Sequence, residues 1–223
     1  MAVRPEQVLP VTEPWKLVNK VRLIIFTRYP EAGRVKTRLI PALGEKGAAI
    51  FHRKMVKLTL AQTRAFSGEV EVHFSGGSPQ LMKDWLGEQL RYRKQAGTCL
   101  GEKLQYAFTE AFAENKQKVV VIGTDCPGLT TEHIKQAFYL LDSSDLVLGP
   151  AQDGGYYLIG LKKVVKELFS GIKWGSDLVY RQTLAAAKGA RLSLAELEKL
   201  ADIDCPADLP FLAAIKKNAG PAH

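Results

Sequence analysis

The sequence lacks long hydrophobic runs and is poor in cysteine, and both features exclude whole classes of protein. No apolar stretch approaches the ~20 residues that a transmembrane helix requires. Residues 1–20 contain no continuous apolar segment of the kind found in signal peptides, so we expect a cytoplasmic protein. The three cysteines are scattered without a CxxC pair, which argues against a disulfide framework and a structural zinc site and for a reducing compartment.

Common nucleotide-binding signatures are also missing. The sequence contains neither the P-loop pattern GxxxxGK[ST] nor the dinucleotide fingerprint GxGxxG. It lacks RNP-like and helix-turn-helix patterns, although its formal net charge is +8. Between Arg28 and Arg38 there are four basic residues and a single acid. Charge concentrated in so short a segment favours a compact anion, such as a phosphorylated small molecule, over a nucleic acid.

The hydrophobic pattern predicts strands that alternate with helices. Val21–Thr27 and Lys118–Thr124 are the strongest strand candidates, because continuous aliphatic runs are typical of strands covered on both faces. Further strands are expected at residues 69–74, 91–95, 145–150 and 156–161, and helices at 44–66, 102–115, 131–141 and through most of the chain after residue 163. In the first helix, the apolar positions expected to face the core are Ala48, Phe51, Met55, Leu58 and Ala65.

This order of elements predicts one α/β domain. Strands joined through helices imply βαβ crossovers, and therefore a single three-layer α/β/α domain with a mainly parallel sheet over residues 21–217. Prolines at positions 5, 10 and 14 prevent a continuous helix in residues 1–20, which we expect to form a flexible arm. Ligands of such folds bind at the carboxyl ends of strands, so the loops that follow strands are the expected place for a site.

A basic loop follows the first predicted strand. Arg34, Lys36 and Arg38 stand at alternate positions in the segment 27–39, where proline and glycine interrupt regular structure. Guanidinium and ammonium groups at the end of a strand suit a di- or triphosphate. The alternative is an ordinary solvated loop, since surface charges are common. The buried strand directly before the loop favours the phosphate interpretation.

A carboxylate stands directly after the second strong strand, in GTDCPGLT. Asp125 is placed where it can hold Mg²⁺ or Mn²⁺ against phosphate oxygens. The alternative is that Asp125 caps the helix that begins near Thr131 or stabilises a turn. Thr130 and Thr131 are nearer to that helix and already supply hydroxyl caps, so we favour the metal role.

Two later acidic segments have local explanations that compete with a binding role. Asp153-Gly154-Gly155 lies between two predicted strands, and by itself it is a plain hairpin turn, although its glycines would also let a ligand approach the backbone. In DIDCPADL, Asp204 precedes Pro206 and could be a helix N-cap. A hard cation prefers more than one carboxylate, so Asp204 is also a candidate second ligand.

Four motifs together carry a family resemblance. GRVKTRL, GTDCPGLT, PAQDGGYYLIGL and DIDCPADL occur in this order. They resemble the bacterial transferases known as radical-SAM/selenodomain-associated or arsenosugar-biosynthesis glycosyltransferase-like proteins, which belong to the nucleotide-diphospho-sugar transferase superfamily with the GT-A fold. The chain is more distantly similar to guanylyltransferases and cytidylyltransferases of the same fold. The resemblance extends from about Val21 to Leu212.

The resemblance implies roles for the charged residues. It implies that Arg34, Lys36 and Arg38 bind the nucleotide phosphates, with Lys36 contributing to catalysis. It also implies that Asp125, as a catalytic residue, holds a divalent metal, Mg²⁺ or Mn²⁺, together with Asp204.

The resemblance also implies an acceptor or sugar pocket. Asp153, Gly154 and Gly155 would line it, with Asp153 orienting or deprotonating the acceptor, and Trp174 would lie on the acceptor side. The segment 97–103 (GTCLGEK) resembles the Gly-x-Asp-Leu-Gly-Glu-Arg segment of the family. Gly97 and Gly101 are therefore expected near the base or sugar.

The sequence departs from the family pattern at three points. Cys99 stands where an Asp is usual, and Cys205 stands where a Thr is usual. The Asp-x-Asp motif is reduced to one carboxylate, since Cys126 and Pro127 follow Asp125. This last departure favours the nucleotidyltransferase manner of metal binding.

The function expected from these features is transfer from a nucleotide donor with the help of a divalent metal. The donor is a nucleotide sugar in the glycosyltransferase interpretation and a nucleoside triphosphate, with release of pyrophosphate, in the alternative. A different class of answer is a non-catalytic nucleotide sensor. The expected partners are the nucleotide and a small-molecule acceptor, with no nucleic acid and no membrane insertion. The donor base, the acceptor and homo-oligomer formation stay open.

Overall fold

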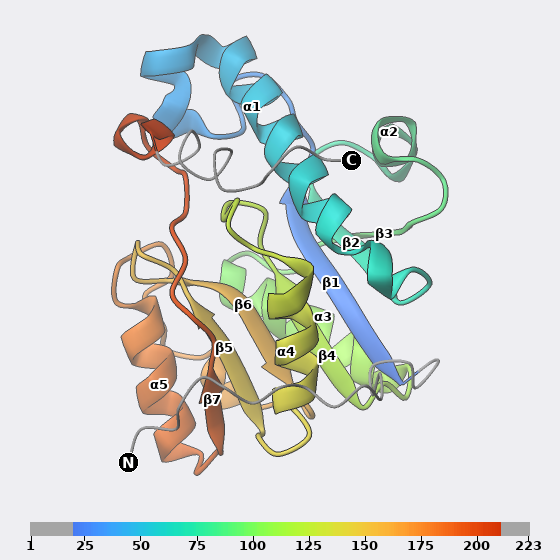
Figure 1. Ribbon diagram of the computed structural model, residues 1–223, viewed down its shortest axis with the longest axis vertical. Helices are drawn as coiled ribbons and strands as arrows, with labels where there is room; N and C mark the ends of the chain where they lie inside the picture. The colour runs from blue at the N-terminus through green and yellow to red at the C-terminus, as the bar shows by residue number, and fades with distance from the viewer. Residues whose placement is uncertain (1–19, 211–223) are drawn as a thin grey trace.

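A computed structural model describes residues 20–210 of the chain (Figure 1). Of the predicted arm and domain, residues 1–19 and 211–217 therefore lie outside the described residues. The described residues form a seven-stranded sheet with the order β3-β2-β1-β4-β6-β5-β7. The strands are β1 (Val21–Arg28), β2 (Val70–Ser75), β3 (Arg91–Lys94), β4 (Lys118–Ile122), β5 (Leu146–Pro150), β6 (Tyr156–Leu161) and β7 (Leu194–Glu196). Strand β6 pairs antiparallel with both of its neighbours, and the other pairs are parallel.

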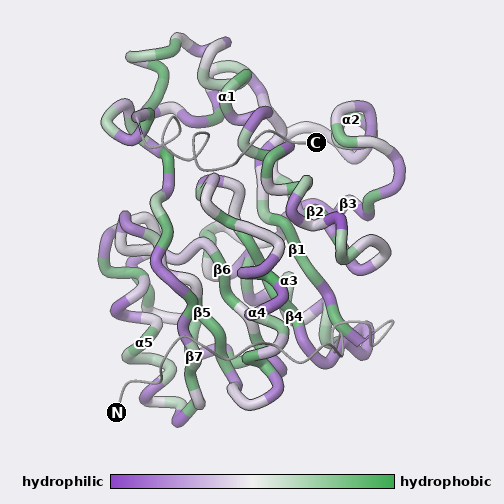
Figure 2. Tube along the Cα trace, viewed as in Figure 1, coloured by the Kyte–Doolittle hydropathy of each residue, from purple (hydrophilic) through white to green (hydrophobic). Residues whose placement is uncertain are grey.

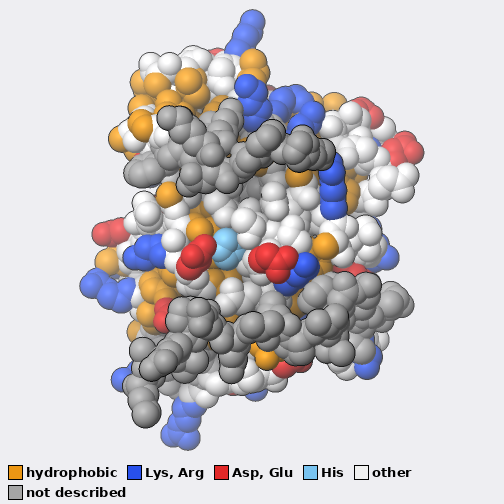
Figure 3. All heavy atoms as spheres, in the orientation of Figure 1, with side chains coloured by type: hydrophobic (Ala, Val, Ile, Leu, Met, Phe, Trp, Pro, Cys, Tyr) orange, Lys and Arg blue, Asp and Glu red, His pale blue; other side chains and the backbone are white. Residues whose placement is uncertain are grey.

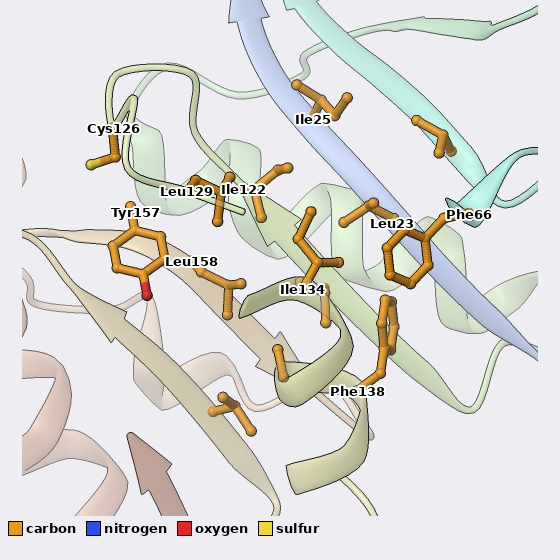
Figure 4. Close-up of a cluster of buried hydrophobic side chains, with 14 of the residues drawn as sticks. Leu23, Ile25, Phe66, Ile122, Cys126, Leu129, Ile134, Phe138, Tyr157 and Leu158 are labelled. Carbon is orange, nitrogen blue, oxygen red and sulfur yellow. The ribbon is translucent and has the colours of Figure 1, made fainter. Parts of the chain in front are cut away.

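Helices cover both faces of this sheet, so the predicted three-layer α/β/α domain with a mainly parallel sheet is confirmed. The α-helices are α1 (Ile40–Gln62), α2 (Pro79–Leu86), α3 (Leu100–Ala113), α4 (Thr131–Leu140) and α5 (Val179–Gly189). One core cluster joins the sheet to α4 and α2, and Figure 4 shows Ile134 of α4 beside Leu23 of β1 and the Phe138 ring of α4 against Phe66. A second cluster joins the opposite face to α3 and α5. Strands β1 and β5 are largely hydrophobic along their length, as Figure 2 shows, because each is buried on both faces.

Helix α1 differs from its prediction at both ends. It begins at Ile40 and is kinked at Gly44, whose φ of 68° and ψ of 167° are accessible essentially to glycine alone. Ala48 and Met55 face the core as expected, but Leu58 is 46% exposed and Ala65 is exposed beyond the helix end. The buried face also includes His52 and Thr59. The predicted core face of this helix was therefore partly wrong. It was inferred from apolar residues alone, whereas the buried face also contains polar ones.

The C-terminal part was predicted as mostly helical, and this was partly wrong. Helix α5 lies there, but the parallel edge strand β7 and an extended segment of residues 197–205 follow it. Strand β7 has three residues, of which two are exposed. So short and exposed a strand shows no alternation of apolar and polar residues, and a sequence pattern therefore cannot predict it.

A buried ionic network fastens the strands β1, β2 and β3 to the end of α3. Strand β2 was predicted to alternate apolar and polar residues, yet its polar Glu71 and His73 are also buried. Glu71 accepts hydrogen bonds from Arg22 (2.5 Å) and from Arg93 (2.6 Å), and both arginines also bind Glu114. Burial acts to raise the pKa of Glu71, but the neighbouring His73 ring, with Nε2 3.6 Å from Glu71 Oε1, the hydrogen bond from Arg93 and the charge of Arg22 together lower it to about 2.

This network predicts a loss of stability in acid. The carboxyl of Glu71 has an ordinary pKa of 4.5, and its pKa in the folded protein is about 2. Its contribution to the free energy of unfolding is therefore fully present above pH 4.5. We expect the free energy of unfolding to fall as the pH drops from 4.5 towards about 2. Glu71→Gln should lose about 3 kcal/mol at neutral pH, because it leaves Arg22 poorly paired, and should show a weaker acid dependence. Urea denaturation at several pH values measures both effects.

The matched control is Glu132→Gln, whose carboxylate is exposed and lies 2.8 Å from Lys135. An exposed pair of this kind contributes below about 1 kcal/mol. An equal loss in the two variants would contradict the special contribution of the buried network.

Candidate functional site

Three segments meet at the carboxyl ends of β1 and β4. The loop after β1 leads into a short 3-10 helix, η2 (Thr37–Leu39), and the loop after β4 carries Asp125. The third segment follows β7 and runs past the sheet towards the 3-10 helix η5 (Pro206–Asp208), as Figure 1 shows. The backbone of Ile203 in this segment donates a 2.9 Å hydrogen bond to the Asp125 carbonyl. Residues from the start, middle and end of the domain are therefore joined here.

Lys36 is the residue that connects the three segments. Its Nζ lies 2.7 Å from Asp125 Oδ1 and 3.6 Å from Asp204 Oδ1, and it donates a hydrogen bond to the carbonyl of Ile203. The side chain is only 4% exposed. Its backbone adopts φ 47° and ψ 44°, a left-handed conformation that is uncommon for a residue with a side chain. Such geometry is maintained when surrounding contacts compensate for it, and it is frequent at functional sites.

The two arginines of the basic loop differ in position. Arg38 Nη1 lies 2.9 Å from Asp204 Oδ2, and its side chain is 70% exposed. Arg34 instead lies 3.4 Å from Glu31 in its own loop and is 76% exposed. The structure thus brings Lys36, Arg38, Asp125 and Asp204 together, whereas Arg34 points into solvent. Lys and Arg side chains also gather over α1 on the face seen in Figure 3, which is favourable for an anionic ligand.

Both carboxylates are free of the capping roles that compete with binding. Thr130 is the N-cap of α4 and accepts from the backbone of His133, so Asp125 is not needed there. Cys205, and not Asp204, occupies the N-cap position of η5, with Asp208 binding back to the Cys205 backbone. The N-cap alternative for Asp204 is therefore wrong, because the helix starts one residue later than that role requires.

The Asp153 turn has the predicted hairpin form between β5 and β6, which pair antiparallel. Asp153 Oδ1 accepts from the backbone of Gly155 at 2.8 Å. Gly154 has a φ of +87°, and a Cβ atom there would lie 2.3 Å from the Asp177 carbonyl. Its lack of a side chain is thus explained by contact with the protein's own backbone. Ligand contact by Gly154 and Gly155 stays a prediction.

We expect Gly154→Ala to lower the free energy of unfolding by about 3 kcal/mol, because it adds a clash to an unfavourable φ. Gly171→Ala is the matched control, since Gly171 has a φ of +72° but nothing within 4 Å of the added Cβ. That control should lose about 1 kcal/mol from backbone strain alone. Urea denaturation distinguishes the two, and equal losses would show that the Asp177 contact is unimportant.

Gly97, Gly101 and Trp174 also have local packing partners. A Cβ at Gly101 would lie 2.4 Å from Trp174 Nε1, and one at Gly97 would lie 2.6 Å from Glu102 Cβ. The Trp174 ring meets Tyr156 edge-on at 6.4 Å. The indole therefore connects the start of α3 with the start of β6. The predicted closeness of these residues to the base or acceptor is compatible with this arrangement and stays a prediction.

Two residues of this region were not singled out by sequence reasoning. Asp202 Oδ1 accepts from the backbone of Asp153 at 3.3 Å, and burial together with the Asp153 charge raises the pKa of Asp202. His52 of α1 lies with Nε2 3.0 Å from the Arg28 carbonyl at the end of β1, and burial lowers its pKa. The spacing of Asp202 two residues before Asp204 was an available signal. Nothing local marks His52, because its partner is a backbone carbonyl distant in the sequence.

The oxygen atoms around Lys36 are of the kind that a divalent metal prefers. Within residues 20–210 there is no group of three or more His, Cys, Asp or Glu side chains arranged to hold a metal. Asp125, Asp204 and the Ile203 carbonyl nevertheless present hard oxygen donors to one point. Mg²⁺ is commonly held by one or two carboxylates with substrate phosphates and water. The residues present therefore fit a metal that is completed by its substrate.

Comparison with known proteins identifies relatives of this chain. Residues 58–176 match a family described as "Uncharacterized protein conserved in bacteria (DUF2064)". A crystal structure from Desulfovibrio desulfuricans G20, of a candidate nucleotide-diphospho-sugar transferase, is 34% identical with a TM-score of 0.86. The match covers 91% of this chain and 90% of that chain. No curated protein matches the sequence.

More distant structures share the fold. The inositol-1-phosphate CTP transferase from T. maritima is 15% identical with a TM-score of 0.56, covering 92% of this chain and 99% of that chain. Rv0371c from Mycobacterium tuberculosis H37Rv, in complex with manganese, is 14% identical with a TM-score of 0.53, covering 86% and 97%. The nucleotide-diphospho-sugar transferase type of fold expected from the motifs is thereby confirmed. Between residues 20 and 210, no helix is long and apolar enough to cross a bilayer.

Proposed function

The chain belongs to the DUF2064 family, and from this premise we propose that it is a metal-dependent transferase that uses a nucleotide sugar as donor. The observation that carries the proposal is the convergence of Lys36, Asp125 and Asp204 at the carboxyl ends of β1 and β4. In folds of this type, ligands bind at that edge of the sheet.

Each charged residue has a role in this proposal. Asp125 and Asp204 would hold Mg²⁺ or Mn²⁺, which supplies charge neutralisation at the donor phosphates. Lys36 and Arg38 would stabilise the negative charge that develops on the leaving nucleoside diphosphate. Arg34, which is exposed, would reach the donor from the rim of the site. No protein nucleophile is required, because positioning and electrostatic stabilisation account for such a transfer.

The acceptor side of the proposal rests on the hairpin turn. Asp153 would orient or deprotonate the acceptor hydroxyl, and its carboxylate is anchored by the Gly155 backbone. Gly154, Gly155 and Trp174 would line the pocket, with Gly97 and Gly101 nearer the base or sugar. The finer assignment to radical-SAM/selenodomain-associated or arsenosugar-biosynthesis transferases is supported by the motif resemblance alone. A cytoplasmic location is supported by the three cysteines, all of which are free.

The second candidate is a nucleotidyltransferase that releases pyrophosphate. The observation that favours it is the single carboxylate after β4, where Cys126 and Pro127 replace the second acid of an Asp-x-Asp motif. The shared fold with a CTP transferase is consistent with this alternative. The third candidate is a protein that is not an enzyme, namely a sensor that binds a nucleotide without catalysing a reaction.

A ligand screen followed by product analysis tests the proposal. Thermal shift with nucleoside triphosphates and nucleotide sugars, each with and without Mn²⁺, should give stabilisation that requires the metal. Release of a nucleoside diphosphate from a nucleotide sugar supports glycosyl transfer, and release of pyrophosphate from a triphosphate supports the alternative. Binding without any product would identify a sensor. Stabilisation by none of these ligands would reject the proposed function.

A further inference from the structure

The ammonium group of Lys36 lies at the point that the proposed metal would use. Its three oxygen neighbours are Asp125 Oδ1 at 2.7 Å, the Ile203 carbonyl and Asp204 Oδ1 at 3.6 Å. Two of these are the carboxylates proposed as metal ligands, and all three are hard oxygen donors. With only 4% of its side chain exposed, Lys36 fills the space between the two loops.

An ammonium ion and a divalent cation compete for such a place. They repel each other, and they require the same oxygen lone pairs. A buried ammonium group that loses its partners is strongly disfavoured, so Lys36 needs another anion if it is to leave. In the proposed function, the donor phosphate is the anion available at this edge of the sheet.

We propose that Lys36 is a latch that couples metal binding to donor binding, an inference that rests on the proposed function. Without a donor, Lys36 neutralises Asp125 and Asp204 and keeps the affinity for a divalent metal low. When donor and metal bind together, the ammonium group moves to the phosphate and the two carboxylates become available. Binding of donor and metal is then cooperative, and the coupling is reciprocal.

The surroundings of Lys36 are suited to this exchange. Its left-handed backbone (φ 47°, ψ 44°) is unfavourable by itself, so breaking the ion pairs would remove contacts that hold the loop in this conformation. Asp204 keeps a cation when Lys36 leaves, because Arg38 already lies 2.9 Å from its other carboxylate oxygen. Asp125 is half exposed and can be solvated. Neither carboxylate is therefore left as an isolated buried charge.

The direct test measures Mn²⁺ binding in the absence of nucleotide. The readout is the electron paramagnetic resonance signal of free Mn²⁺. Lys36→Met should bind Mn²⁺ about tenfold more tightly than the wild type, within the usual range of coupling between sites. Lys57→Met, an exposed lysine on the same helix as His52, is the control and should match the wild type. Adding Asp125→Asn to Lys36→Met should abolish the gain, which locates the metal. Equal or weaker Mn²⁺ binding by a folded Lys36→Met overturns the latch.

A wild-type measurement keeps the latch falsifiable if Lys36→Met does not fold. A buried, hydrogen-bonded lysine ammonium exchanges slowly with water and is observable by ¹⁵N NMR. At Mg²⁺ concentrations that saturate the site, judged by competition with Mn²⁺, the Lys36 signal should move towards that of exposed lysines. An unchanged signal under saturation overturns the latch.

Failure of the latch and failure of the proposed function are distinguishable. Wild-type protein that forms product with a metal, together with an unchanged Mn²⁺ affinity in Lys36→Met, rejects the latch alone. Absence of metal-dependent donor binding in the wild type rejects the proposed function, whatever Lys36→Met does with Mn²⁺.

Discussion

Asp125→Asn should lower kcat by about 10²–10³-fold, the usual loss when one charge-stabilising group is removed from an active site. The amide keeps the shape of the side chain but removes the negative charge that would hold the metal. It also removes the charge that attracts Lys36 at 2.7 Å. Turnover is measured at saturating donor and metal, and calorimetric titration with donor and Mn²⁺ should show that metal-dependent binding is weakened.

Asp142→Asn is the matched control for this prediction. The Asp142 side chain is 54% exposed and lies 2.5 Å from Lys118, which resembles the 52% exposure and lysine contact of Asp125. It lies just beyond the end of α4, outside the three segments of the site. Wild-type turnover in this control, with matching thermal stability in both variants, would assign the loss to the site. Wild-type donor and Mn²⁺ affinity in Asp125→Asn would exclude Asp125 as a metal ligand.

Removal of the Lys36 charge is the second change with a large expected effect. Lys36→Met should lower kcat by about 10²–10³-fold, because a desolvated ammonium group stabilises developing phosphate charge much more than an exposed one. Arg34→Gln and Arg38→Gln should each lose less than about tenfold, since exposed charges are screened by solvent. Their side chains are 76% and 70% exposed, against 4% for Lys36.

The ranking of these three variants is the informative result. Equal losses at all three positions would mean that the loop acts only through its total charge, and would contradict a specific role for Lys36. Lys57→Met, on the exposed side of α1, controls for the loss of one positive charge from the molecule. Steady-state kinetics that separate kcat from KM show whether Lys36 acts in the transition state or in binding alone.

Several elements were predictable because their signal is local. The aliphatic runs of β1 and β4 identified buried parallel strands, and the apolar stripe of α4 named residues that do face the sheet. The Asp153 turn was predicted as a hairpin for the same reason. Predictions failed where burial depends on distant partners, as for Leu58 of α1 and for the short edge strand β7.

Local patterns were sufficient to name the candidate charges of the site, because a loop after a buried strand is recognisable from a few consecutive residues. Such patterns could not predict that these charged residues converge on one site. It depends on the parallel pairing of β1 with β4, which brings the Lys36 and Asp125 loops to one edge. It also depends on the extended segment after β7, which carries Asp204 to the same edge through the Ile203 backbone. Contacts between segments so distant along the chain arise from packing of the whole domain, so that packing alone placed a lysine between the two carboxylates.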